Sequence, residues 1–155
     1  MEFTPPRVAL NLPGPTGESN TYSLHARGRI LCLADTQERL LAQLAAVFST
    51  GNHAVLEDRD DVRTLRAALP DTLRPLIILV QDWTRAGFQH VLSAGGAVRL
   101  LEVCAQIAAR PGPIIGVQAR SEGPYPYALA PLLIERSLSI NTAAAGGNAS
   151  LMNVS

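Results

Sequence analysis

The stretch Leu76-Ile-Ile-Leu-Val80 is an unbroken run of large aliphatic residues. Such a run predicts a strand of a parallel sheet, because helices cover both faces of a parallel sheet and both faces then need apolar side chains. Shorter apolar runs at 29–34, 53–56 and 113–117 predict further strands. The pattern of 88–94 fits either a helix stripe or a strand.

Segments between these runs carry apolar residues at helical spacing. The first is predicted to begin at Asp35, which forms a capping-box-like pair with Glu38, and to end at Gly51-Asn52. The second follows the acidic stretch 58–61, which suits a helix N-terminus, and stops at Pro70. The expected inward positions are Leu40, Leu44, Val47 and Phe48 in the first helix, Val62, Leu65 and Leu69 in the second, and Val98, Leu101, Ala105, Ile107 and Ala108 in a third.

Short strands that alternate with helices predict an α/β fold. Right-handed crossovers make a Rossmann-like three-layer domain with a mostly parallel sheet the expected outcome. The length of 155 residues suits one such domain. We expect an extended Pro/Gly-rich connector at 1–26, the α/β domain at 27–120, and a linker with a small-residue docking motif at 121–155. Residues 1–19 are expected to lie extended across a surface rather than to fold on themselves.

Composition excludes several classes of function. Lys+Arg and Asp+Glu both number 13, so the chain lacks the basic surplus with which nucleic-acid binders neutralise phosphates. No apolar run approaches the roughly 20 residues of a membrane span, and no signal-peptide pattern opens the chain, so a cytoplasmic protein is expected. A neutral surface also favours association, which fits a domain that lies against a partner. The opening residues are typical of a segment of a longer polypeptide, with a natural short chain as the alternative.

The residue types that carry catalysis or bind metals are scattered. Cys32 and Cys104 lie in apolar runs, and both are expected to be small buried hydrophobic residues rather than nucleophiles. His25, His53 and His90 are isolated from one another, without the spacing of metal ligands. We therefore predict no catalytic, cofactor-binding or metal-binding residue in this chain.

Two long segments carry a family resemblance. They are Leu12-Pro-Gly-Pro-Thr-Gly-Glu-Ser-Asn-Thr-Tyr22 and Ile134-Glu-Arg-Ser-Leu-Ser-Ile-Asn-Thr-Ala-Ala-Ala-Gly-Gly-Asn-Ala-Ser-Leu-Met152. Both resemble the C-terminal end of the long proline utilisation A (PutA) flavoenzymes, and the second is very specific to that family. The resemblance covers nearly the whole chain and is weakest from 59 to 87.

The resemblance implies a role in proline catabolism. PutA proteins are bifunctional oxidoreductases, with an FAD-dependent proline dehydrogenase and an NAD-dependent L-glutamate γ-semialdehyde dehydrogenase that together convert proline to glutamate. Long members carry an extra non-catalytic C-terminal domain. That domain packs over the aldehyde dehydrogenase domain of the same polypeptide and helps to seal the substrate-channelling tunnel. The resemblance thus implies that this chain alone is not an enzyme and holds no cofactor, while FAD and NAD belong to the parent protein.

The chain also resembles the NAD-binding domain of aldehyde dehydrogenases, through Arg27-Gly-Arg-Ile-Leu-Cys-Leu33 and the following 50–56. That superfamily has a Lys-Pro whose lysine contacts the cofactor ribose, where this chain has Glu57-Asp58. Its Phe-Thr-Gly-Ser motif is degraded here to Leu92-Ser-Ala-Gly95, and the comparison favours a strand at 88–94. These departures argue against NAD binding. The alternatives are a stand-alone nucleotide-binding domain that uses Glu57 and Gly95-Gly96, or an oligomerisation domain.

The last part of the chain is the expected docking site. Amide and hydroxyl side chains there can hydrogen-bond a partner, and glycines let two backbones approach closely. The residues concerned are Asn141, Thr142, Gly146, Gly147, Asn148 and Ser150. The aromatic residues Tyr22, Trp83, Tyr125 and Tyr127 are interpreted either as interface anchors or as partly buried core.

Overall fold

The computed structural model describes residues 9–120 and 126–141. The chain divides into two compact units. The first, here called the α/β unit, is formed by Ala26–Ile134, and the second, the strand unit, contains the described residues 9–25 and 135–141. Each is described by itself below.

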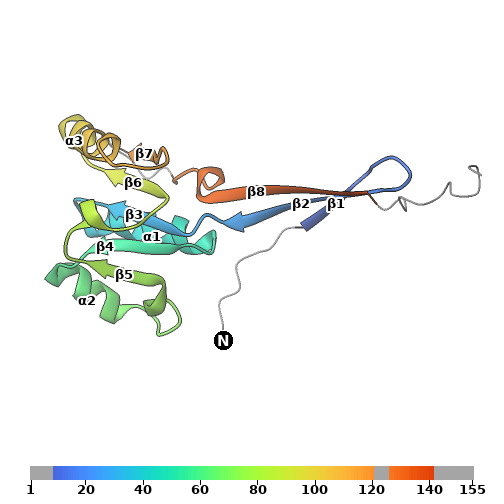
Figure 1. Cartoon of the computed structure of the whole chain (residues 1–155). Helices are drawn as coiled ribbons and strands as arrows, with labels where there is room; N and C mark the ends of the chain where they lie inside the picture. Colours follow the sequence, from blue (N-terminus) through green and yellow to red (C-terminus); the bar gives the residue numbers. More distant parts are fainter. Residues whose placement is uncertain (1–8, 121–125, 142–155) are drawn as a thin grey trace, which may run out of the picture. The chain divides into compact units, whose positions relative to one another are not determined.

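A five-stranded sheet lies at the centre of the α/β unit (Figure 1). Its spatial order is β5-β4-β3-β6-β7, and every neighbouring pair is parallel. The strands are β3 (Arg29–Leu33), β4 (His53–Glu57), β5 (Ile77–Val80), β6 (His90–Ala94) and β7 (Gly116–Arg120). The predicted α/β fold is therefore confirmed, and 88–94 contributes a strand rather than a helix.

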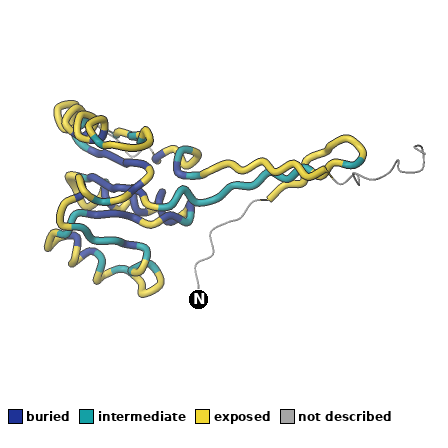
Figure 2. Tube along the Cα trace, viewed as in Figure 1, coloured by how far each residue is buried: buried dark blue, intermediate teal, exposed yellow. Residues whose placement is uncertain are grey.

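The strand β3 shows why the sheet forms three layers. Ile30 and Cys32 pack in one apolar cluster with residues of α1 (Gln37–Ser49) and α2 (Asp60–Ala68). Leu31 and Leu33 pack in a second cluster with residues of α3 (Ala97–Ala108). Successive strand side chains point to opposite faces, so α1 and α2 cover one face of the sheet and α3 covers the other. Figure 2 shows the buried residues concentrated in these strands.

Short 3₁₀ turns complete the α/β unit. They are η1 (Arg74–Leu76), η2 (Trp83–Arg85) and η3 (Ala130–Leu132). Leu76, predicted to open the strand β5, belongs to η1 instead. In the part of the chain that the structure describes, no helix is long and apolar enough to cross a bilayer.

Two predicted boundaries need correction. Thr36, not Asp35, caps α1, because its side chain accepts a hydrogen bond from the backbone N–H of Arg39. The strand β7 begins at Gly116 rather than at Pro113, which has no N–H to donate to a sheet. A Cβ at Gly116 would lie 2.8 Å from Cε1 of His90, so the strand begins where glycine permits close approach.

The strand unit contains a three-stranded sheet in the order β1-β2-β8. Its strands are β1 (Ala9–Leu12), β2 (Glu18–Ala26) and β8 (Leu133–Asn141). The last residue of β2, Ala26, and the first two of β8, Leu133 and Ile134, belong to the α/β unit. Ala9 pairs with Ser23 and Leu12 with Asn20 in an antiparallel hairpin. Residues 9–12, which are part of the predicted extended connector, form a strand paired with 20–23, and the Pro/Gly-rich stretch 13–17 forms the hairpin turn.

The helix α3 differs most from its sequence prediction. Val103 and Ile107 are its buried residues. Val98 and Leu101, predicted to face inward, are 74% and 70% exposed, and Ala105 and Ala108 are exposed as well. Cys104 is also exposed, so the prediction that both cysteines are buried is confirmed only for Cys32. The helix is apolar on both sides, and periodicity alone cannot tell which side meets the sheet.

The two-sided burial of β3 predicts a large effect of truncation there. We expect Leu31→Ala to lower the free energy of unfolding by about 2–5 kcal/mol, because Leu31 is fully buried and a cavity would remain. Leu41→Ala is the matched control, since Leu41 is exposed on α1 and its truncation should cost within about 0.5 kcal/mol. Urea unfolding followed by circular dichroism measures both, and equal losses would contradict the assigned core.

The two cysteines should react differently. Burial raises the pKa of the Cys32 thiol, so this residue stays protonated and shielded near pH 8. A thiol reagent added to the folded chain is therefore expected to label Cys104 alone, and to label both cysteines in urea. Mass spectrometry of labelled peptides gives the result. Equal labelling of Cys32 in the folded chain would show that β3 is not in the core.

Candidate functional site

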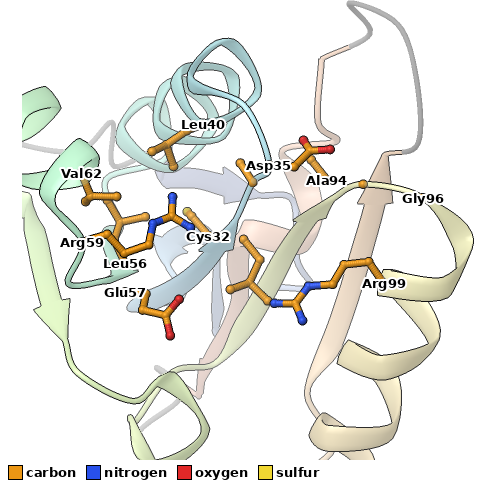
Figure 3. Close-up of a pocket in the computed structure, with 13 residues that line it drawn as sticks. Cys32, Asp35, Leu40, Leu56, Glu57, Arg59, Val62, Ala94, Gly96 and Arg99 are labelled. Carbon is orange, nitrogen blue, oxygen red and sulfur yellow. The ribbon is translucent and has the colours of Figure 1, made fainter.

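A crevice opens where the order of the strands reverses. The strand β3 is followed on one side by β4 and on the other by β6, and the carboxyl ends of such strands form the usual ligand position of an open α/β sheet. A cavity of about 290 Å³ lies there. It is lined by Cys32, Leu33, Ala34, Asp35, Leu40, Leu56, Glu57, Arg59, Val62, Ala94, Gly95, Gly96 and Arg99 (Figure 3).

Glu57 and Asp58, at the end of β4, have different surroundings. Glu57 lines the crevice, and its carboxylate makes no hydrogen bond or ion pair to the residues that the structure describes, although its backbone pairs with Val80 of β5. Asp58 accepts hydrogen bonds from Arg63 at 2.6 and 2.8 Å and from Gln81 at 2.7 Å. The hydrogen bonds from Arg63 are the main reason why the pKa of Asp58 is lowered. Glu57 is thus the carboxylate that a ligand in the crevice would meet.

Gly95 and Gly96 join β6 to α3 at the opposite side of the crevice. Gly95 has φ +138°, a conformation that side-chain-bearing residues rarely adopt. Gly96 caps α3 without a side chain, and a Cβ there would meet nothing within 4 Å. The structure therefore brings together the residues that the nucleotide-binding alternative named, Glu57 and Gly95-Gly96.

The other charged residues of the crevice already have partners. Asp35 binds Arg39 at 2.8 Å, and Arg59 binds Asp61 at 3.0 Å. Arg99 lies 3.4 Å from Glu102. Arg59 and Arg99 enter from opposite sides in Figure 3. Two acids and two arginines therefore line the cavity without a surplus of either charge.

The crevice offers little for covalent chemistry. Its cysteine, Cys32, is buried with a raised pKa, whereas a nucleophilic cysteine needs a lowered one. His90, at the amino end of β6, is neutral over a wider pH range because burial lowers its pKa. Within 9–120 and 126–141, no group of three or more His, Cys, Asp or Glu side chains could hold a metal ion.

Gln43 and Tyr127 support the crevice from inside the domain. The fully buried Gln43 of α1 places Nε2 within 3.0 Å of the Leu33 carbonyl, 3.2 Å of the Leu92 carbonyl and 2.9 Å of the Tyr127 hydroxyl. It therefore links β3 to β6 at the reversal of strand order. Sequence reasoning missed Gln43, although its position inside the apolar stripe of α1 was a usable signal.

The predicted docking residues lie mostly beyond the structural description. Asn141 ends β8 and is exposed, whereas Thr142, Gly146, Gly147, Asn148 and Ser150 lie outside the described residues. Among the aromatic candidates, Trp83 and Tyr127 are buried core residues and Tyr22 is half-buried, while Tyr125 is not described.

The outer side of α3 is a second candidate surface. At 3.6 residues per turn, Val98, Leu101, Ala105 and Ala108 form one stripe, with Cys104 at its margin. All of them are exposed, and Ile114 beyond the helix is exposed too. Contiguous exposed apolar residues of this kind mark interaction sites.

No protein-family model matches the chain. The chain is 46% identical over 151 residues to the bifunctional protein PutA of Rhizobium meliloti. The aligned region covers 94% of this chain and 12% of that protein. The chain is 45% identical over 145 residues to the bifunctional protein PutA of Escherichia coli K12, covering 92% of this chain and 11% of that protein. The chain thus spans about one-tenth of the length of these relatives.

Solved structures support the fold. A crystal structure of a bifunctional proline utilization A protein matches with a TM-score of 0.58 at 22% identity, over 75% of this chain and 14% of that one. A putative aldehyde dehydrogenase from Burkholderia cenocepacia matches with a TM-score of 0.53 at 16% identity, over 72% of this chain and 27% of that one. The predicted relationship is confirmed: the chain is a homologue of one segment of the bifunctional PutA proteins, with a fold that it shares with aldehyde dehydrogenases.

Proposed function

We propose that this chain is a non-catalytic interaction domain of a PutA-type polypeptide, which covers the aldehyde dehydrogenase domain and helps to seal the tunnel between the two active sites. The observation that carries the proposal is the exposed apolar stripe of α3, named above. A helix that is apolar on both sides belongs between two layers, and the sheet supplies only one of them. The aldehyde dehydrogenase domain of the same polypeptide supplies the other.

The chemistry of the crevice agrees with this role. A lid over an active site excludes water and limits the escape of a reactive aldehyde without providing a reacting group. The protonated, buried Cys32 and the paired charges of Asp35, Arg59 and Arg99 fit such a passive domain. FAD and NAD are then held by other domains of the polypeptide, which works in the cytoplasm on the route from proline to glutamate.

The C-terminal residues complete the proposed contact. The docking set from Asn141 to Ser150 combines amides, hydroxyls and glycines. Such residues suit a segment that lies close to a partner backbone and exchanges hydrogen bonds with it. In this proposal α3 supplies apolar contact and the C-terminal segment supplies polar contact.

The stripe on α3 is tested in a full-length PutA-type polypeptide that contains this chain. We expect Leu101→Asp to lower the coupled conversion of proline to glutamate about tenfold or more, because an unpaired carboxylate would be buried in the contact. Proline oxidation alone should be unchanged. Leu41→Asp, which places the same charge on an exposed leucine of α1, is the matched control and should keep both activities. Full coupled conversion in Leu101→Asp would refute the stripe as a covered surface.

The docking segment is tested in the same polypeptide by removing residues 142–155. Loss of coupled conversion with intact proline oxidation, accompanied by release of the aldehyde intermediate into solution, is the expected result. Unchanged conversion and unchanged release would argue against docking by this segment.

A second candidate function is nucleotide binding in the crevice. Glu57 and Gly95-Gly96 line one cavity at the reversal of strand order, where an acid can bind ribose hydroxyls and a helix N-terminus can face phosphate. The charges of the cavity argue against nucleotide binding. Two acids line the cavity, and its two arginines already pair with Asp61 and Glu102. The interaction domain therefore remains the favoured function.

Calorimetric titration of the chain with NAD decides between the two. We expect no saturable heat up to about 1 mM, the weak limit of ordinary ligand affinities. Saturable binding that Glu57→Gln weakens would establish the nucleotide function instead. Binding that Glu57→Gln leaves unchanged would exclude the crevice as its location.

A further inference from the structure

Asn52, just before β4, is a fully buried polar residue whose side chain makes three hydrogen bonds. Its Oδ1 accepts from the Gly28 backbone N–H at 2.7 Å. Its Nδ2 donates to the Leu132 carbonyl at 2.8 Å and to Thr50 Oγ1 at 2.8 Å. Asn52 therefore connects the residue that precedes β3 to the residue that precedes β8.

Arg27 makes a second set of bonds to the same segment. Its backbone N–H donates to the Leu132 carbonyl at 3.2 Å. Its guanidinium donates from Nε to the Pro131 carbonyl at 2.6 Å and from a terminal nitrogen to the Leu133 carbonyl at 3.0 Å. Three successive carbonyls are thus held by two side chains, a set of contacts here called the Asn52–Arg27 clasp.

The clasp lies where β2 ends and β8 begins. Arg27 follows the last residue of β2, and Leu132 precedes the first residue of β8. Farther along the same pair of strands, Ser139 Oγ donates to Asn20 Oδ1 at 2.5 Å. Both contacts fit one antiparallel register, because Asn20 precedes Arg27 by as many residues as Ser139 follows Leu132.

The strands themselves specify this register weakly. Every described residue of β2 and β8 is half-buried or exposed, so no packed core would be lost if one strand slipped. A slip by one residue reverses which side chains share a face. In β8, Leu138 and Ile140 alternate with Ser137 and Ser139. The register therefore decides which of these two pairs shares a face of the sheet with a given side chain of β2.

We propose that the Asn52–Arg27 clasp sets the register of β2 with β8, and so determines the face on which Leu138 and Ile140 are presented. Asn52 and Arg27 are positioning residues in this proposal. The bonds go to main-chain carbonyls, so they fix the path of the backbone whatever side chains occupy 131–133. That this face meets the aldehyde dehydrogenase domain rests on the proposed function, whereas the setting of the register does not.

Neighbouring contacts offer a matched control. Gln118 of β7 donates from Nε2 to the Ala128 carbonyl at 3.0 Å and accepts from the Ala128 N–H at 3.0 Å. Gln118 thus holds the backbone three residues before Pro131, and its side-chain hydrogen bonds go to Ala128 rather than to 131–133. Gln118→Ala removes comparable side chain–backbone bonds and leaves the clasp in place.

Register is measured by disulfide formation in the chain. Asn20→Cys with Ser139→Cys reports the native register, and Asn20→Cys with Leu138→Cys reports a slip by one residue, both with Cys104→Ser to remove the exposed thiol. Adding Asn52→Leu is expected to lower the ratio of native to slipped disulfide about fivefold, the factor that corresponds to roughly one buried hydrogen bond. Gln118→Ala should leave the ratio unchanged.

Arg27→Lys is the second variant, and it serves if Asn52→Leu does not fold. It keeps the positive charge but cannot bond both the Pro131 and the Leu133 carbonyls, so it should lower the ratio as well. An unchanged ratio in folded variants of either residue would overturn the proposal. Failure of the proposed function would give a different result from failure of this proposal. In that case the variants would still shift the disulfide ratio, but coupled conversion of proline to glutamate in the full-length polypeptide would stay the same.

Discussion

A parallel sheet must be covered on both faces, and this requirement governs the α/β unit. The side chains of Leu31 and Leu33 lie on one face of β3, and those of Ile30 and Cys32 lie on the other. Both faces of the sheet are therefore apolar and must be shielded from water. One face receives α1 and α2. The other receives α3, and this helix contributes few buried residues to the contact while it carries further apolar residues on its outer side. The helix that completes the domain is therefore also the one that carries the proposed interaction surface.

The crevice combines the strand order of a dinucleotide-binding fold with a balanced set of charges. The strand order, the glycine turn before α3 and the acid at the end of β4 are all present. The charges around the cavity, however, are balanced and largely paired. Beneath the cavity, the Gln43 side chain contacts the Leu33 carbonyl of β3, the Leu92 carbonyl of β6 and the Tyr127 hydroxyl. These contacts preserve the shape of the domain, which an interaction surface needs as much as a cofactor does.

Sequence periodicity predicted the α/β class and most strands and helices, because continuous apolar runs such as 76–80 leave few alternatives. It predicted the helix α3 but not which side of it is buried, because apolar residues lie on both sides of this helix. It missed the β1–β2 hairpin, because the Pro/Gly-rich stretch at 13–17 reads equally well as a connector. Gln43 and the Asn52–Arg27 clasp depend on contacts between residues far apart in the chain, which no local pattern contains.

In the proposed function, the outer side of α3 is covered in a full-length PutA-type polypeptide. Cys104 lies at the margin of the apolar stripe and is exposed in this chain, so it reports directly on that covering. The measurement is the rate at which a thiol reagent labels Cys104 in the isolated chain and in a full-length PutA-type polypeptide that contains it. The account predicts rapid labelling in the isolated chain and slow labelling in the full-length polypeptide. Equal rates in the two would contradict it.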